Sequence, residues 1–301
     1  MEKPKFGVHV GIPEGTKIEE LASFTEFIED CGFDGVFVSD SFSTYHDPIP
    51  ALATLAGLSK RLHLGTCVYI LAQRHPLQVA KQTAYVQRIS GGRLILGVGV
   101  GWRDKEFEGL NIPYKMRGLI TDESIEIIKM AWDKGLVNFS GKWFKINEFE
   151  INAKLDVRPK IWIGGNSKPA LTRSAKKGDG WIPTDFSASD YARYGPTLIS
   201  ELDKYGRDAS NFVLASHLMV LTSNDDSKIG IIGERLANRF GSTIDEMKEW
   251  ALVGSPSELV DRITQYSDAG ITYHVMSIWG LPIEQAKETL EVFATKIIPA
   301  I

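Results

Sequence analysis

The chain has 301 residues, of which 43% are hydrophobic and 24% charged, and its formal net charge is -4. This length and composition suit one large soluble domain or two small ones. Because no linker divides the sequence, a single domain over 1–301 is expected. The near balance of acidic and basic side chains argues against a nucleic-acid partner, which needs a basic surface. No apolar run approaches the roughly 20 residues that a membrane span requires, so a membrane partner is not expected either.

The two cysteines, Cys31 and Cys67, have no metal-ligand spacing, and the start MEKPKFGV lacks the apolar core of a secretion signal. A reduced, cytoplasmic setting is therefore the expectation.

Short apolar segments alternate with helical patterns along the chain. The first strand is expected over 5–10, and Thr16 is the expected N-cap of a helix that ends at Cys31. Further helices are expected over 49–60, 76–89, 118–134, 169–177 and 188–205, then from a cap at Ser255 to Gly270, and through 290–297. The other expected strands are 33–39, 62–70, 93–100, 160–163, 180–183, 211–221 and 273–279.

Eight strands that alternate with eight helices predict a parallel sheet, and this number favours closure into a (β/α)8 TIM barrel. Two excursions interrupt the alternation. After the fourth strand come a helix and a predicted hairpin around Ser140-Gly141, and after the seventh strand comes the polar stretch 222–254.

The fourth strand carries a glycine at every second position, at Gly97, Gly99 and Gly101. Because alternate residues face the same side of a strand, these glycines leave a bare groove there. Either packed protein or a flat ligand must lie against it. Tight packing is favoured for the first two glycines, whereas Gly101 and Trp102, at the strand's exit, are expected to line a site.

In a barrel of this kind the site forms at the carboxyl ends of the strands. Asp40 and Ser41 stand at one such end, where Asp40 orients a ligand, acts as an acid or base, or caps the loop. His9, His46 and His217 are further acid–base candidates, each unpaired in the sequence. The tryptophans expected on this rim, which suit an aromatic ligand, are Trp102, Trp181 and Trp279.

The turn Gly164-Gly165-Asn166-Ser167 precedes a predicted helix. Two glycines allow close approach of the backbone and the helix presents free N–H groups, so the turn is a phosphate-site candidate, although an ordinary N-cap turn has the same pattern. The spacing of Gly97, Gly99 and Gly101 does not match a dinucleotide fingerprint. No His, Cys, Asp or Glu cluster has metal-ligand spacing, and no G-x-S-x-G elbow is present, so neither a metal site nor a typical serine hydrolase is expected.

Taken together, these segments resemble the bacterial-luciferase-like flavin and deazaflavin oxidoreductases over nearly the whole chain. The motifs that carry the resemblance are GFDGVFVSD at 32–40, LHLGTCVYI with RHPLQVAKQ at 62–82, SGGRLILGVGVGWRDKEF at 90–107, RPKIWIGGNS at 158–167, KKGDGWIP at 176–183 and GSPSELVDRITQYSDAGI at 254–271.

The resemblance implies a TIM barrel, usually dimeric, that binds FMN or coenzyme F420 at the strand ends and transfers hydride over the ring. It places Asp40 against the ring system and makes Cys67-Val68 a bulge, with a non-prolyl cis peptide, that backs the ring. Asp40 and Ser41 are the catalytic candidates. The cofactor-binding candidates are Asp40, Cys67, Val68, Gly101, Trp102, Gly164, Gly165, Asn166 and Ser167.

Two positions depart from the family's sugar-phosphate dehydrogenases, which carry His where this chain has Ser41 and Glu where it has Trp102. Sugar-phosphate chemistry is therefore not expected. The segments GTCV and GVGVGW favour the deazaflavin branch. The leading hypothesis is an F420-dependent oxidoreductase acting on a small organic substrate, and the alternatives are an FMN-dependent monooxygenase and a non-catalytic cofactor-binding barrel.

Overall fold

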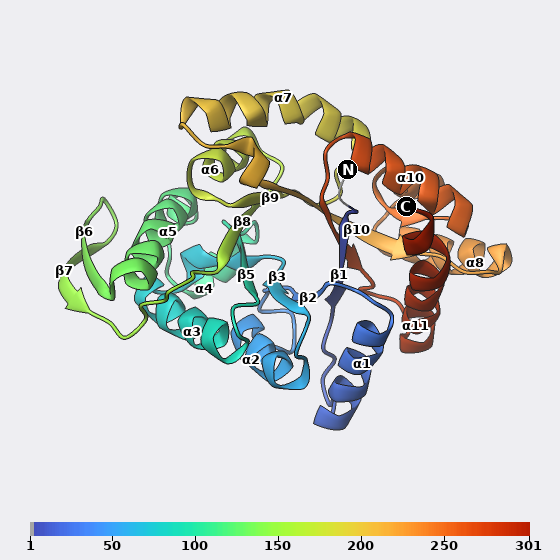
Figure 1. Ribbon diagram of the computed structural model, residues 1–301, viewed down its shortest axis with the longest axis horizontal. Helices are drawn as coiled ribbons and strands as arrows, with labels where there is room; N and C mark the ends of the chain where they lie inside the picture. The colour runs from blue at the N-terminus through green and yellow to red at the C-terminus, as the bar shows by residue number, and fades with distance from the viewer. Residues whose placement is uncertain (1–2) are drawn as a thin grey trace.

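The predicted strands pair in parallel and close into a barrel in the computed structural model, which describes residues 3–301 (Figure 1). The pairing order is β1-β2-β3-β5-β8-β9-β10-β12, and closure comes from β1, which pairs with both β2 and β12. The barrel strands are β1 (Lys5–Val10), β2 (Gly35–Val38), β3 (His63–Thr66), β5 (Leu94–Gly99), β8 (Lys160–Gly164), β9 (Gly180–Ile182), β10 (Val213–Leu221) and β12 (Tyr273–Ser277). The prediction of a (β/α)8 barrel is confirmed.

A helix follows each barrel strand and packs on the outside of the barrel (Figure 1). The predicted capping boxes at Ser187 and Ser255 are both present, and their side chains accept hydrogen bonds from the backbones of Asp190 and Glu258. The outer helices are α1 (Ile18–Asp30), α2 (Pro48–Leu58), α3 (Pro76–Ile89), α5 (Arg117–Lys134), α6 (Lys168–Lys177), α7 (Ala188–Lys204), α10 (Pro256–Asp268) and α11 (Ile283–Val292), the last extended by a π-helical turn over Phe293–Ile297.

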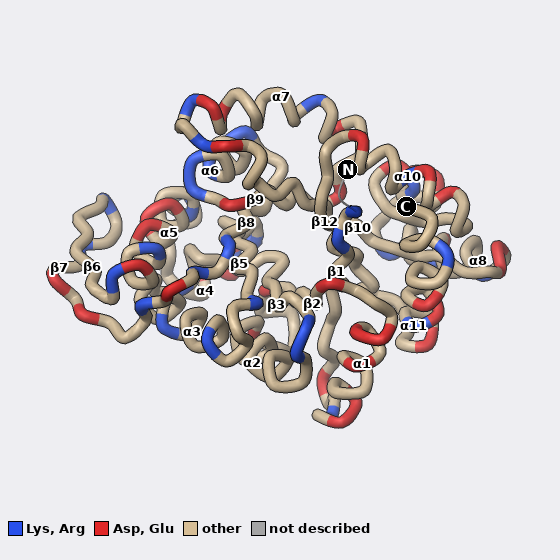
Figure 2. The backbone as a smooth tube through the Cα atoms, viewed as in Figure 1, with Lys and Arg blue, Asp and Glu red and all other residues tan. Residues whose placement is uncertain are grey.

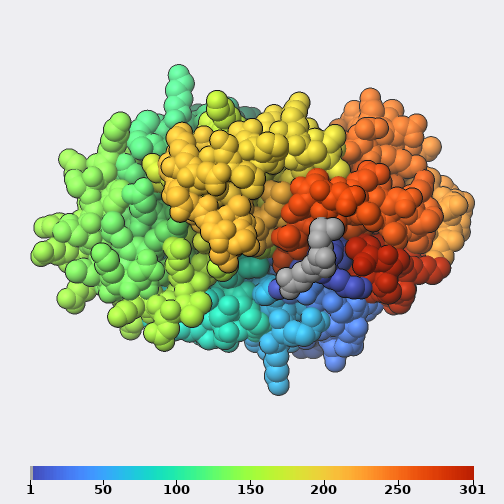
Figure 3. Space-filling view, turned by 45° about the horizontal axis from the view of Figure 1, so that its top comes forward, coloured from blue at the N-terminus to red at the C-terminus, as the bar shows by residue number. Residues whose placement is uncertain are grey.

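Both excursions lie where the sequence predicts them. After β5 come the short helix α4 (Asp104–Gly109), which the sequence analysis missed, then α5 and the hairpin of β6 (Leu136–Ser140) and β7 (Lys145–Glu150). After β10 come α8 (Asp226–Arg239), α9 (Ile244–Trp250) and β11 (Leu252–Val253), which pairs with β10. The two excursions occupy opposite ends of the molecule, as the green and orange regions of Figure 3 show.

Two predicted boundaries are wrong. The third strand is not continuous over 62–70, because the cis peptide bond between Cys67 and Val68 interrupts it and leaves the separate strand β4 (Tyr69–Ile70) beside β5. Helix α1 begins after Lys17 rather than after a Thr16 cap. The Thr16 hydroxyl instead donates to the Pro13 carbonyl at 2.8 Å and closes a local turn.

An aromatic cluster fills the barrel interior. The rings of Phe37 and Trp162 stack with centroids 5.9 Å apart, and Tyr273 packs edge-on against both. A Cβ atom added at Gly7 would lie 2.5 Å from Phe37, so this glycine gives the cluster its room. The barrel interior is therefore filled by side chains, and a site is expected at the carboxyl ends of the strands.

Charged residues gather on the outer helices and loops, as Figure 2 shows. None of the helices within residues 3–301 combines the length and apolar character that crossing a bilayer requires.

Candidate functional site

Asp40 is the most tightly held carboxyl group at the barrel mouth. Its Oδ2 accepts hydrogen bonds from the Arg74 Nη1 at 2.7 Å and from the Ile70 N–H at 2.8 Å, and its Oδ1 accepts from the Arg74 Nη2 at 2.9 Å. This two-pronged geometry is that of a carboxylate facing a guanidinium group. Asp40 thereby joins the end of β2 to the segment that follows the cis peptide.

Burial raises the pKa of Asp40 above its usual value, although the attraction of Arg74 opposes the shift. The Asp40 side chain is only 4% exposed and that of Arg74 is 20% exposed. Because its oxygens are occupied by Arg74 and Ile70, this side chain positions the third-strand bulge, and proton exchange would require breaking the ion pair.

Val68 fills the groove that the glycine ladder leaves. A Cβ atom at Gly99 would lie 2.6 Å from one Val68 methyl group, and a Cβ atom at Gly164 would lie 2.8 Å from the other. A Cβ atom at Gly97 would overlap the backbone carbonyl of Thr66. Packed protein therefore lies against Gly97 and Gly99, as expected, and Val68, which is partly exposed, forms the wall that faces the mouth.

Ser41 belongs to a polar network between β2 and β5. Its hydroxyl lies 3.1 Å from the Glu106 Oε1 and accepts from the Arg103 Nη1 at 2.9 Å. The other Glu106 oxygen accepts from the Gln73 Nε2 at 3.0 Å. Glu106 is not among the predicted site residues. It lies at the start of helix α4, which the sequence did not predict, and brings a carboxylate beside Ser41.

The Gly164–Ser167 turn leads into α6, as predicted. Ser167 is its N-cap, and its hydroxyl accepts from the Ala170 N–H at 3.4 Å. The Asn166 side chain donates to the Thr184 carbonyl at 2.7 Å and accepts from the Thr184 N–H at 3.1 Å, which ties this turn to the one after β9. Within residues 3–301, the backbone N–H groups of Asn166 and Ser167 donate no hydrogen bond, so they are free to bind an anion.

Only two of the three tryptophans lie on the rim. Trp102 is 75% exposed and Trp279 is 40% exposed. Trp181 is 1% exposed and packs outward among Phe186 and Tyr191, with its indole N–H donating to the Gly165 carbonyl at 2.9 Å. The expectation that Trp181 lies on the rim is wrong because its side chain is on the outward face of β9.

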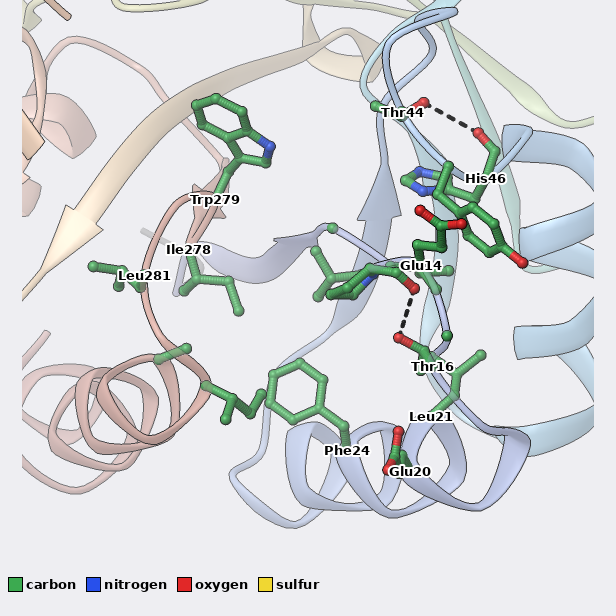
Figure 4. A pocket seen from close by; sticks show the side chains of 18 of the residues that line it. Glu14, Thr16, Glu20, Leu21, Phe24, Thr44, His46, Ile278, Trp279 and Leu281 are labelled. Atoms are coloured by element: carbon green, nitrogen blue, oxygen red, sulfur yellow. Dashed lines mark hydrogen bonds between the residues drawn. The ribbon is translucent and has the colours of Figure 1, made fainter. Parts of the chain in front are cut away.

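A groove of about 1240 Å³ opens beside the mouth, between α1, α11 and the loop after β2. Trp279 and His46 stand on opposite sides of it, and Phe24 and Leu21 point in from α1 (Figure 4). The groove reaches the residues at the ends of β1 and β12.

Two histidines that appear unrelated in the sequence meet at the mouth. The His217 Nε2 lies 3.0 Å from the His9 Nδ1, and the Ser277 Oγ lies 3.1 Å from that same His9 nitrogen. Burial lowers the pKa of His217 to about 4, and burial followed by the proximity of His217 lowers that of His9 well below its usual value. Both imidazoles are therefore neutral at pH 7.

Asp185, after β9, is a further acidic group that the sequence analysis missed. Its backbone has a φ of 55° and its N–H donates to the His217 carbonyl at 3.2 Å. Within residues 3–301 its carboxylate has no hydrogen-bond or ion-pair partner. Asp185 is exposed at the surface of the mouth, and desolvation by the protein beside it raises its pKa to about 6.

The described part of the chain, residues 3–301, holds no group of three or more His, Cys, Asp or Glu side chains placed to bind a metal ion.

Comparison with known proteins places the chain in one family. The family model for luciferase-like monooxygenases matches residues 5–229, which is more than half of the chain. The protein belongs to the luciferase-like monooxygenase family. The resemblance inferred from the motifs is thereby confirmed, as is the expectation of an oxidoreductase.

Curated relatives of this luciferase-like protein match it over nearly their whole length. It is 27% identical to the 5,10-methylenetetrahydromethanopterin reductase of Archaeoglobus fulgidus, over 98% of this chain and 99% of the relative. It is also 27% identical to the F420-dependent glucose-6-phosphate dehydrogenase of Beutenbergia cavernae, over 93% of this chain and 92% of the relative.

Solved structures confirm the luciferase-like fold. An F420-dependent secondary alcohol dehydrogenase in complex with an F420-acetone adduct superimposes with a TM-score of 0.87 at 18% identity, over 99% of both chains. The monooxygenase RslO1 from Streptomyces bottropensis also has a TM-score of 0.87, at 20% identity, over 98% of this chain and 99% of the other.

Proposed function

We propose that this protein is an F420-dependent oxidoreductase that transfers hydride between the deazaflavin and a small organic substrate. The observation that carries the proposal is the apolar Val68 wall and the free N–H groups after β8, on one side of the same barrel mouth. The F420-dependent relative at 27% identity supports this cofactor. In this proposal the protein is a cytoplasmic homodimer.

The residues at the mouth fit a flat ring with a phosphate tail. The Val68 side chain presents apolar surface for a ring, and the bond that precedes it is cis, as the resemblance implies. The Gly164–Ser167 turn at the start of α6 offers N–H groups and the positive end of the helix dipole to a phosphate. Gly101 and Trp102 complete the rim, with Cys67 buried beneath.

When bound, F420 supplies the hydride acceptor or donor, while the protein binds and orients the reactants. Asp40 holds the bulge that carries Val68, through Ile70 and Arg74. Ser41 is proposed to face the cofactor from the network that contains Glu106. Asp40 thus acts as a positioning residue rather than as the group that exchanges a proton.

Asp185 is proposed to exchange the proton that accompanies hydride transfer to a carbonyl or from an alcohol. Its raised pKa of about 6 predicts that kcat changes with pH around that value, which gives one limb of the pH profile. In the reduction direction, which uses the carboxylic acid, kcat falls as the pH rises through about 6. In the oxidation direction, which uses the carboxylate, it falls as the pH drops through that value. The titratable groups whose charges interact with that of Asp185 are Cys67, Tyr191 and Tyr266.

Asp185→Asn is expected to lower kcat by about 100-fold or more and to remove this limb, because a general acid or base contributes that much. The measurement is a pH profile of kcat for wild type and variant. The matched control is Asp190→Asn, at an acid bound within its helix cap, which should keep the limb. An unchanged limb in Asp185→Asn would exclude Asp185 from proton exchange.

Gly165→Ala tests the phosphate seat. The added methyl group would stand 3.2 Å from the Ala170 Cβ, on a backbone with a φ of 111° that L-residues disfavour. We expect the affinity for F420 to fall by about 10-fold or more, because losing one or two charge-assisted hydrogen bonds costs that much. Fluorescence titration measures it. Gly270→Ala, with a φ of 91° at the opposite end of the barrel, carries a similar backbone penalty and should bind normally.

The two cofactors are separated by titrating the protein with F420 and with FMN, then measuring turnover and oxygen consumption. Hydride transfer with F420 and none with FMN is the expected result. FMN binding with oxygen consumption would favour the monooxygenase alternative, and cofactor binding with no turnover on any substrate would favour the non-catalytic barrel.

A further inference from the structure

Three neighbouring strands place polar side chains in one layer at the top of the barrel interior. Along β12, Tyr273 and Val275 face the interior, so the next inward position is Ser277. By the same alternation Ala215 on β10 is followed by His217. His9 on β1 pairs in register with Ser277 and completes the layer.

The two histidines of this layer share one hydrogen bond. Both are neutral, so each ring has one N–H donor and one acceptor nitrogen. If His217 donates to His9, the outer nitrogen of His9 is a donor and that of His217 an acceptor. If His9 donates, the two outer roles are exchanged. In either arrangement the pair offers one donor and one acceptor.

Those outer nitrogens have no partner in the protein. The His9 Nε2 and the His217 Nδ1 are both buried and unpaired within residues 3–301, and His9 is 5% exposed. A buried polar atom without a hydrogen bond is costly, so such atoms are normally met by a ligand or by ordered water. His217 as a whole residue is half-buried, so this layer lies close to the surface at the mouth.

The approach to this layer disfavours anions. The groove of Figure 4 lies next to this layer and not within it: Val10 and Ile278, which follow His9 and Ser277 in the chain, line it, whereas the three residues of the layer do not. Its charged lining is four glutamates, Glu14, Glu19, Glu20 and Glu284, against the single lysine Lys287. A phosphate in the groove would meet carboxylates, and a phosphate at the layer would meet a neutral imidazole pair, so neither place offsets its charge.

We propose that His9, His217 and Ser277 form the site for the reacting oxygen of the substrate, and that the substrate is an uncharged ketone or secondary alcohol that enters by the groove of Figure 4. The hydroxyl of an alcohol matches the donor and acceptor of the pair, and a carbonyl oxygen uses the donor. This inference rests on the proposed function and assigns its substrate class.

The test begins with the cofactor-free protein and NMR of the histidine side chains, labelled with 15N. The probes are acetone, cyclohexanone, 2-propanol and, as the anion, inorganic phosphate. We expect the neutral probes to shift the ring signals of His9 and His217 saturably, while phosphate leaves them in place. If no neutral probe shifts these signals, or if phosphate shifts them equally, the proposal is overturned.

A matched pair of variants gives the kinetic test. His217→Phe removes both ring nitrogens of a histidine in the proposed site. The control is His274→Phe, at a histidine of β12 on the outward face of the barrel, whose Nδ1 is hydrogen-bonded to the Ser216 hydroxyl at 2.8 Å. His217→Phe is expected to raise the KM for the best neutral probe by about 3- to 10-fold, the value of one hydrogen bond, while F420 affinity stays unchanged. His274→Phe, checked for folding by thermal denaturation, should leave KM unchanged.

Failure of this inference and failure of the proposed function give different results. An equal KM in His217→Phe and wild type, with F420 bound and turnover intact, overturns the oxygen site alone. Absence of F420 binding to wild type overturns the proposed cofactor, while the NMR result without cofactor still decides whether the histidine pair binds a neutral oxygen compound.

Discussion

Asp40→Ala is expected to lower the free energy of unfolding by about 3 kcal/mol, the lower end of the range for breaking a buried ion pair, because Arg74 then keeps only the exposed carboxylate of Asp47 as its counter-charge. The substitution removes the two hydrogen bonds that Arg74 donates to Asp40 and leaves the Ile70 N–H without its acceptor. Since Asp40 anchors the segment after Val68, F420 affinity should fall as well. Urea denaturation and fluorescence titration measure the two effects.

The matched control is Asp47→Ala, which removes the other carboxylate beside Arg74. Asp47 lies 3.2 Å from the Arg74 Nη2 and its side chain is 47% exposed, so the loss should stay within about 1 kcal/mol. It also caps α2 through the Ile49 N–H, which adds about 1 kcal/mol at most. Equal losses in the two variants would contradict the special role given to Asp40.

Gly97→Ala should lower the stability of the fold more than any other glycine-to-alanine substitution in the barrel strands. The new Cβ atom would overlap the Thr66 carbonyl oxygen, which is backbone and cannot rotate away. The Thr66 hydroxyl also donates to the Gly97 carbonyl at 2.7 Å, so the two strands are held together at this point. The expected loss in the free energy of unfolding exceeds about 3 kcal/mol, the upper part of the range for overpacked cores.

Gly57→Ala, in helix α2, is the comparison for this prediction. A Cβ atom at Gly57 meets nothing within 4 Å, and alanine favours a helix over glycine. We expect a gain of about 0.5–1 kcal/mol. A small loss in Gly97→Ala, comparable to ordinary surface variants, would show that β3 and β5 can separate there and would weaken the account of the glycine wall.

The barrel could be predicted from the sequence because its signals are local and repeated. Caps at Ser187 and Ser255 and apolar runs such as 94–98 each indicate one element, and their alternation indicates the fold. The turn Gly164–Ser167 was likewise recognisable from its place between a strand and a helix.

The meeting of His9 with His217 depends on closure of the barrel and not on any local pattern. The two residues are 208 positions apart in the sequence. Both side chains face the interior because each residue occupies an inward-facing position of its strand. Counting alternate positions back from each strand end would have placed both on the inner face. The same count would have turned Trp181 outward.

The break in the third strand and the helix α4 were missed for different reasons. The motif resemblance implied a cis peptide after Cys67, but the apolar run 62–70 has the composition of one strand. Helix α4 is only six residues long and its charged sequence carries little apolar periodicity. Glu106 consequently had no predicted place beside Ser41 until the fold brought them together.

A crystal structure of the protein soaked with F420 would show whether the cofactor lies at the barrel mouth. We expect density for the ring in van der Waals contact with Val68, and for the phosphate against the N–H groups of Asn166 and Ser167 at the start of α6. Density for F420 elsewhere, or none at saturating concentration in crystals whose barrel mouth is open to solvent, would contradict this expectation.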